Sequence, residues 1–315
     1  TYYLTTFFLI IIFYILNNFI KEKKILFNYK GQKHQKFSGL KEIPLTGGIY
    51  LTILSVILFF QYNEIFSLFI LSIFVAGIIS DINLISSPKF RFVFQSVLLI
   101  LFVFLLDIQI NQTKFILLDA LLKNIYFKYF FSVFCLLILI NGTNFIDGLN
   151  GLMLGYFFLI ILIIFNLNLF ENIGLEKNLI NNFIIIMIYL FLMNVNNKLF
   201  MGDSGSYVLG LVSGYFLIKI YEVSQEISPY FIILLLWYPC FENLFSIIRK
   251  FSFKRSPIVP DNNHFHQLLF FYIKKKINSK KFNPNNISAY LIILYNAFIF
   301  LIGCNNPSNT QLQIF

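Results

Sequence analysis

Uninterrupted apolar runs recur along the whole chain, and they constrain its fold more than any other feature. Residues 7–16 and 184–193, for example, contain no charged residue. Hydrophobic residues make up 58% of the chain and charged residues only 12%, against about half and about a quarter in soluble domains. A soluble core cannot bury so much apolar surface, whereas each transmembrane helix needs roughly 20 apolar residues. The sequence therefore predicts an all-α, polytopic integral membrane protein.

A transmembrane β-barrel is the alternative, but its strands would alternate apolar and polar residues over roughly ten positions. These runs do not alternate. Polar clusters divide residues 1–315, read as a single domain, into about ten expected transmembrane helices. The expected spans are residues 2–20, 44–61, 64–80, 90–108, 124–141, 151–169, 180–196, 204–221, 228–248 and 286–304. The first run lacks a basic leader and a small-residue cleavage site, so no cleavable signal peptide is expected.

Basic residues are distributed unevenly between the two sides of the predicted bundle. If ten spans alternate in direction, the loops around residues 21–43, 81–91, 142–150, 197–203 and 249–285 share one side and hold 19 of the 24 Lys and Arg residues. Such an excess marks the cytoplasmic side, so both termini are expected outside the cytoplasm. The net charge of +10 then fits anionic membrane lipids as partners and requires no nucleic acid.

Four polar clusters on the predicted cytoplasmic side each begin where an apolar run stops. They comprise residues 80–91, 141–151, 200–206 and 255–266. Glycine-rich loops at helix ends can present backbone N–H groups to anions, and carboxylate and carboxamide oxygens are the ligands that Mg²⁺ prefers. The clusters together indicate metal-assisted handling of phosphate groups at a membrane surface.

Each cluster also has an ordinary structural explanation. The residues around Asn144 would suit a plain turn, and Asp203 would suit the N-terminal cap of a helix. His264 and His266 lie two positions apart, on different sides of a helix, which argues against an isolated zinc site. The three cysteines show no metal or redox spacing and are expected to be small core residues. These explanations do not predict four such clusters, in this order, on one side.

The ordered set of motifs resembles the polyprenyl-phosphate N-acetylhexosamine-1-phosphate transferase family, of the glycosyltransferase family 4 type. The matching segments are residues 44–48, 81–91, 141–151, 200–206 and 264–266. Members of this family transfer a sugar 1-phosphate from a UDP-sugar to a polyprenyl phosphate, usually undecaprenyl phosphate in bacteria, and release UMP. The two histidines followed by Gln267 are similar to the branch that initiates envelope glycans such as lipopolysaccharide. The alternative is the peptidoglycan branch, phospho-N-acetylmuramoyl-pentapeptide transferase.

The resemblance implies a Mg²⁺ cofactor, with Mn²⁺ as a substitute, and roles for individual residues. Asn144 and Asp203 would bind the metal. The implied catalytic residues are Asp81, Asp147, Asp203, His264 and His266. The implied substrate-binding residues are Asn141, Asn144, Lys89, Arg91 and Arg255. The implied location is the bacterial inner membrane, with the active site facing the cytoplasm.

Ser80 departs from the family pattern, which usually has two adjacent aspartates where this chain has Ser80 and Asp81. A carboxylate base at position 80 is therefore absent, although a phosphate monoester with a second pKa of about 6 is already largely ionised at neutral pH. A non-catalytic scaffold protein and a transporter of lipid-linked sugars are the rival functions. The sequence leaves open the sugar, the prenyl chain length and whether the chain works as a homodimer.

Overall fold

The computed structural model describes residues 2–26, 43–84, 87–224, 226–254, 256, 263–276 and 283–314, and every regular element in these ranges is helical. This confirms the predicted all-α class. The principal helices are α1 (Tyr2–Glu22), α2 (Gly47–Phe59), α3 (Glu64–Asp81), α4 (Pro88–Leu105), α6 (Ile125–Ile146), α7 (Leu152–Asn166), α8 (Lys177–Val195), α9 (Gly202–Val223), α10 (Pro229–Ser252) and α12 (Pro284–Cys304). The shorter elements are α5 (Ile116–Leu121), the 3-10 turn η1 (Glu171–Ile173), α11 (Phe265–Lys276) and α13 (Thr310–Ile314).

Each of the ten expected spans coincides with one principal helix, and eight of these helices are long and apolar enough to cross a membrane. Helices α2 and α7 are shorter, with 13 and 15 residues. Helix α2 begins only at Gly47, because the backbone of Pro44 in the preceding segment pairs with Phe200 instead of continuing a helix (Phe200 N to Pro44 O, 2.9 Å). The described residues thus form a polytopic helical bundle, as predicted.

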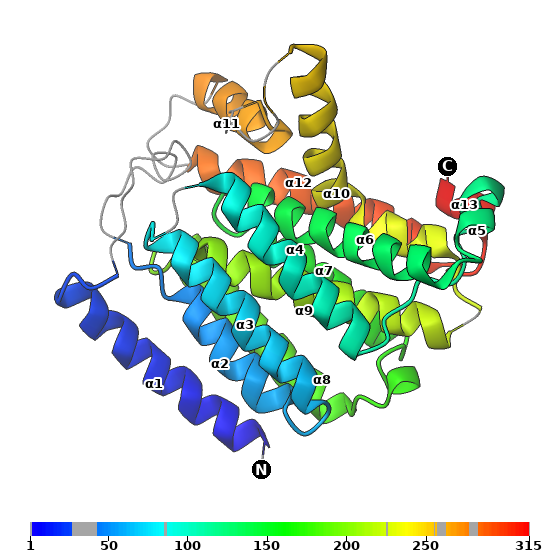
Figure 1. Cartoon of the computed structure of the whole chain (residues 1–315). Helices are drawn as coiled ribbons and strands as arrows, with labels where there is room; N and C mark the ends of the chain where they lie inside the picture. Colours follow the sequence, from blue (N-terminus) through cyan, green and yellow to red (C-terminus); the bar gives the residue numbers. More distant parts are fainter. Residues whose placement is uncertain are drawn as a thin grey trace.

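Helix α9 lies at the centre of the bundle and packs against α2, α3 and α6 (Figure 1). Its glycines allow close backbone contact, as small residues do between membrane helices. A Cβ atom added to Gly210 would lie 3.0 Å from Ile140 Cα in α6, and one added to Gly205 would lie 3.1 Å from Gly48 Cα in α2. Helix α1 lies at one edge of the bundle, beside α8.

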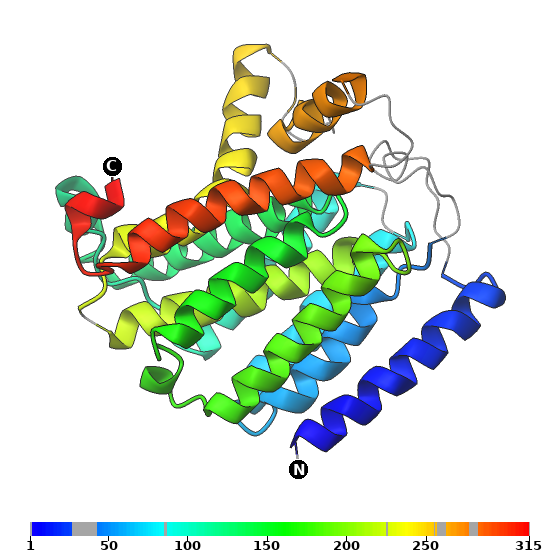
Figure 2. The ribbon, with the colours of Figure 1, turned by 180° about the vertical axis from the view of Figure 1, so that it is seen from behind.

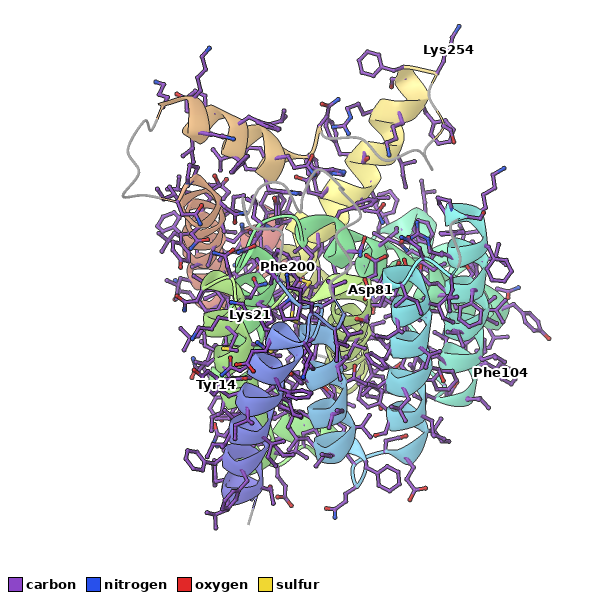
Figure 3. The ribbon with its side chains drawn as sticks, turned by 90° about the vertical axis from the view of Figure 1, so that its left-hand side faces the viewer. Tyr14, Lys21, Asp81, Phe104, Phe200 and Lys254 are labelled. Carbon is purple, nitrogen blue, oxygen red and sulfur yellow. The ribbon has the colours of Figure 1, made fainter. Side chains whose placement is uncertain are left out.

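The C-terminal part of α10, together with α11, projects beyond the other helices at one end of the bundle (Figures 1 and 2). Helix α10 contains Pro239, which has no N–H group and therefore bends the helix. A Cβ atom on Gly142 of α6 would lie 2.2 Å from Pro239 O, so the two backbones touch at the bend. Figure 3 shows Lys254 at the tip of this projection, and Asp81 and Phe200 near the same end of the bundle.

Candidate active site

The N-terminus of α9 receives its cap from a different helix. Its own N-cap residue, Met201, makes no side-chain capping bond. Asp81, the last residue of α3, instead accepts hydrogen bonds from the backbone N–H groups of Asp203 (2.8 Å) and Ser204 (3.1 Å). A carboxylate at a helix N-terminus is also favoured by the helix dipole. Asp81, which is buried, therefore takes the capping role considered for Asp203 and leaves the Asp203 side chain available for other contacts.

Backbone contacts hold this arrangement together. A Cβ atom on Gly77 of α3 would lie 2.2 Å from Ser204 Cα, so α3 and α9 meet without an intervening side chain. The backbone N–H groups of Gly47 and Gly48 donate to Phe200 O (3.0 Å) and Met201 O (3.2 Å). The two glycines at the start of α2 thus fix the segment that leads into Asp203, a role that was not predicted from the sequence.

The Asp203 carboxylate joins three segments of the chain. Its Oδ1 accepts a hydrogen bond from Asn144 Nδ2 in α6 (2.8 Å), and the same amide group donates to Ser206 Oγ (3.0 Å). Its Oδ2 accepts a hydrogen bond from the Ser80 hydroxyl and lies 3.3 Å from Arg91 Nη1 of α4. Arg91 also donates to Ser80 Oγ. The side chains of Arg91 and Asp203 are 30% and 28% exposed, so a ligand can reach them.

Asp147 lies directly after the last residue of α6, three positions from Asn144. Burial raises the pKa of the Asp147 carboxyl well above its ordinary value, and the negative charges of Asp203 and Asp81 raise it further. Three acidic groups therefore share one small region, where Arg91 contributes a positive charge. An additional cation would relieve the remaining repulsion.

His264 and His266 lie beside the loop that follows α6. The His264 ring contacts Phe145 and stacks on His266, with ring centroids 5.0 and 5.7 Å apart. Its Nδ1 is 2.9 Å from Glu242 Oε2 of α10, and the other Glu242 oxygen accepts a hydrogen bond from the first backbone N–H of α11. A Cβ atom on Gly148 would lie 2.5 Å from His266 Nε2. Both histidines are thus held against the Asp147 side of the site.

The other predicted substrate-binding residues occupy different positions. Asn141 donates to Gln95 Oε1 (3.3 Å), one helical turn away from the Asn144 and Arg91 positions. Lys89 is exposed in the first turn of α4, and the described ranges show no hydrogen bond or ion pair for it. Arg255 lies outside the described residues. The roles predicted for these residues and for the catalytic candidates remain predictions.

Ser206 and Gln95 were not predicted from the sequence, although both lie one helical turn after a predicted site residue. Ser206 follows Asp203 by three positions and Gln95 follows Arg91 by four. That spacing places two side chains on the same helix face. For Gln95 this spacing was the only available signal, and it would select many other residues equally well, whereas Ser206 also lies in the polar cluster of residues 200–206.

The donor set fits a magnesium ion that is held mainly by its substrate. The described residues contain no group of three His, Cys, Asp or Glu side chains arranged around a metal position. Mg²⁺ commonly takes only one or two carboxylates and completes its shell with waters and substrate phosphates. Asp203 is a partly exposed carboxylate in a region of excess negative charge, which suits this pattern. Asn144 presents Nδ2 to Asp203, so its amide would have to turn to offer an oxygen.

Comparison with known proteins places these residues in one family. The model of glycosyl transferase family 4 matches residues 63–221, just over half of the chain. The match includes the segments that carry Asp81, Arg91, Asn144, Asp147 and Asp203, and it ends before the histidines.

Three curated relatives are similar to parts of the chain. The undecaprenyl-phosphate alpha-N-acetylglucosaminyl 1-phosphate transferase of Thermotoga maritima is 25% identical over 228 residues, which cover 72% of this chain and 68% of the relative. A probable undecaprenyl-phosphate N-acetylglucosaminyl 1-phosphate transferase of Bacillus subtilis is 30% identical, over 52% of this chain and 43% of the relative. The decaprenyl-phosphate N-acetylglucosaminephosphotransferase of Mycolicibacterium smegmatis is 29% identical, over 42% of this chain and 37% of the relative. The similarity thus spans less than half the length of the last two relatives. The family model, which matches just over half of the chain, and these three similarities together confirm that the chain belongs to glycosyl transferase family 4.

Proposed function

We propose that the chain transfers N-acetylglucosamine 1-phosphate, or a related N-acetylhexosamine 1-phosphate, from a UDP-sugar to a polyprenyl phosphate. An oxygen of the acceptor phosphate forms a bond to the β-phosphorus of the UDP-sugar. The bond from that phosphorus to the bridging oxygen breaks, and UMP leaves with its electron pair. The names of the three relatives support this donor sugar over the pentapeptide transferase alternative.

The observation that carries the proposal is the meeting of Asp81, Asn144 and Asp203 from three segments inside the family match. Two anionic substrates repel each other, so the site has to supply positive charge and alignment. Arg91 would bind a phosphate oxygen. Asp203 and Asn144 would hold Mg²⁺ or Mn²⁺, which would neutralise the donor diphosphate and the departing UMP.

The remaining residues of the site have positioning and donor-binding roles in this proposal. Asp81 acts through the backbone N–H groups of α9 and so positions Asp203. Asp147 would order the loop after α6 around the donor, and His264 and His266 would contact the donor from the opposite side of that loop. A general base is not required, because the acceptor phosphate is already ionised at neutral pH.

We also propose that the site faces the cytoplasm of a bacterial inner membrane. The eight membrane-length helices support a multi-pass membrane location. The excess of basic residues on the loops at the site's end of the bundle supports the orientation, since the projecting α10 and α11 end in Arg249, Lys250 and Lys274 to Lys276.

The proposed function is tested with purified protein, a panel of UDP-N-acetylhexosamines and undecaprenyl phosphate, with release of UMP as the measurement. We expect UMP release that requires both substrates and a divalent cation. Asp203→Asn should lower the turnover by at least about 10²-fold, the size expected for losing a key electrostatic contact. Glu222→Gln is the matched control, because it removes a carboxylate at the opposite end of the same helix.

Two results would contradict parts of this proposal separately. Full activity in excess chelator would refute the metal role of Asp203 and Asn144. Absence of UMP release with every donor, in protein that remains folded and monodisperse, would refute the transferase function. Movement of lipid-linked sugar without UMP release would support the transporter alternative.

A further inference from the structure

Arg91 forms an ion pair with the Asp203 carboxylate, which the proposed metal would also bind. Its guanidinium lies 3.3 Å from Asp203 Oδ2, while Asn144 holds the other oxygen of the same carboxylate. In this structure, a protein side chain therefore supplies the positive charge at Asp203. A divalent cation that bound Asp203 would compete with Arg91 for the same oxygen, because two cations repel each other at that distance.

Ser80 stabilises the contact between Arg91 and Asp203. Its hydroxyl donates to Asp203 Oδ2 and accepts from Arg91 Nη1. The side chain is 1% exposed and neutral, so it bridges the two charged groups without attracting Arg91 away from Asp203. An aspartate at this position would give Arg91 a second anionic partner, and the Arg91 charge would then be shared.

A small pocket, with room for about one water molecule, lies beside Arg91. The pocket is lined by Arg91 together with Ala76, Ile79, Phe94, Gln95 and Tyr207. Ala76 and Ile79 belong to α3, Phe94 and Gln95 to α4, and Tyr207 to α9. Apolar side chains of α3 and α4 thus lie directly beside Arg91, so a phosphate bound to Arg91 would have apolar surface next to it for a prenyl tail.

We propose that Arg91 binds the phosphate of the acceptor lipid and is released for this task when a divalent cation replaces it at Asp203. Ser80 acts as a positioning residue that holds Arg91 on Asp203 until then. This inference rests on the proposed transferase function and adds an order to it: the metal and its nucleotide enter first, and their arrival raises the affinity for the acceptor. The exchange keeps a cation beside Asp203 throughout and makes Arg91 available only when a donor is present.

Thermodynamic linkage gives the coupling a definite signature. If the metal raises the affinity for prenyl phosphate by some factor, prenyl phosphate must raise the affinity for the metal by the same factor. Couplings of this kind are typically about 5- to 150-fold. Both directions can be measured without turnover, so the inference does not depend on an activity assay.

The experiment measures binding of farnesyl phosphate to the purified full chain, without divalent cations and with saturating Mg²⁺ and UMP. In the unaltered protein, Mg²⁺ with UMP should lower the Kd of farnesyl phosphate by a factor in the range of about 5- to 150-fold. With UMP saturating throughout, Mn²⁺ should lower the Kd of farnesyl phosphate by some factor, and saturating farnesyl phosphate should lower the Kd of Mn²⁺, followed by electron paramagnetic resonance, by the same factor.

Substitutions separate Arg91 release from a general effect of charge. Asp203→Asn should bind farnesyl phosphate tightly even without metal, because Arg91 then has no carboxylate to hold it. Ser80→Ala should shift the metal-free affinity in the same direction by a smaller factor. Arg91→Gln should bind weakly under all conditions, and adding Asp203→Asn to it should bring no improvement. Glu222→Gln, which breaks the ion pair with Lys219 at the far end of α9, should leave the coupling unchanged.

The outcomes distinguish this inference from the function on which it rests. If Asp203→Asn raised the affinity equally with and without Arg91, a simple loss of negative charge would explain the result and the inference would be wrong. If the Kd of farnesyl phosphate were the same with and without the metal, the coupling would be wrong and the transferase function would remain intact. No binding of farnesyl or undecaprenyl phosphate under any condition, by folded protein, would refute the transferase function and the coupling together.

Discussion

Replacing Gly77 with alanine would place a methyl group inside the contact between α3 and α9. The added Cβ would lie 2.2 Å from Ser204 Cα and 2.6 Å from Ser204 N. Non-bonded carbon atoms approach to about 3.5 Å at best, so the two helices would have to separate by roughly 1 Å there. The atoms in the way belong to the backbone of α9 and cannot turn aside. The first turn of α9, which carries Asp203, would therefore move.

The size of the effect follows from this displacement. Overpacking of a tightly packed core costs about 1–3 kcal/mol of stability. The separation would also lengthen the two hydrogen bonds by which Asp81 fixes the N-terminus of α9, at 2.8 and 3.1 Å. A displacement of about 1 Å in a positioned group can lower a rate by about 10²-fold. We expect a lowered Tm together with a turnover reduced on that scale.

Gly214→Ala provides the matched control for this prediction. Gly77 lies in α3, whereas Gly214 lies in the middle of α9, the helix that Gly77 contacts. The Cβ atom added at Gly214 would meet the tip of the Leu136 side chain at 2.6 Å. That side chain can move, and both substitutions gain the same helix propensity of about 1 kcal/mol. Thermal unfolding in detergent and UMP release from a UDP-sugar would be measured for both variants. A Gly77→Ala protein with the turnover and Tm of Gly214→Ala would refute the reasoning, because it would show that the contact is not tight.

Three further predictions address the charges and the topology. Ser80→Ala should lower the turnover by less than about tenfold, since one hydrogen bond contributes roughly 0.5–1.5 kcal/mol. Asp81→Asn should lower the turnover much more, because its amide N–H₂ would face a backbone N–H group of α9. Equal losses in the two variants would contradict this division between positioning and capping. The raised pKa of Asp147 means that ionising this carboxyl opposes folding, so metal-free protein should lose stability as the pH rises above about 4, the ordinary Asp value. Asp147→Asn should therefore raise the Tm at neutral pH, by an amount that shrinks towards pH 4. A lower Tm at neutral pH would be evidence against a desolvated carboxylate that is repelled by its neighbours at this position. In a background without native cysteines, a cysteine at Lys276 should resist an impermeant thiol reagent in intact cells, and labelling from outside would overturn the orientation.

The amino-acid sequence was sufficient to predict the fold class and the segments from which the site is built. The length and apolarity of a membrane helix can be read from a single stretch of chain. Its apolar side chains can face lipid, and its backbone groups form hydrogen bonds within the helix, so no neighbouring segment is needed to cover it. Each expected span therefore coincides with a helix. The order of the polar clusters was also sufficient to indicate the family, which the match over residues 63–221 confirms.

The sequence could not determine which carboxylate caps a helix and which is left to bind a ligand. Asp81 and Asp203 are both aspartates next to an apolar run, and either would suit either role. The choice depends on how closely α3 approaches the start of α9, across 122 positions of sequence. The absence of a side chain at Gly77 sets that approach. Only in the folded bundle does Asp81 reach the backbone N–H groups of α9 and leave Asp203 facing Arg91, Ser80 and Asn144, because hydrogen bonds of about 3 Å depend on distances that no local pattern encodes.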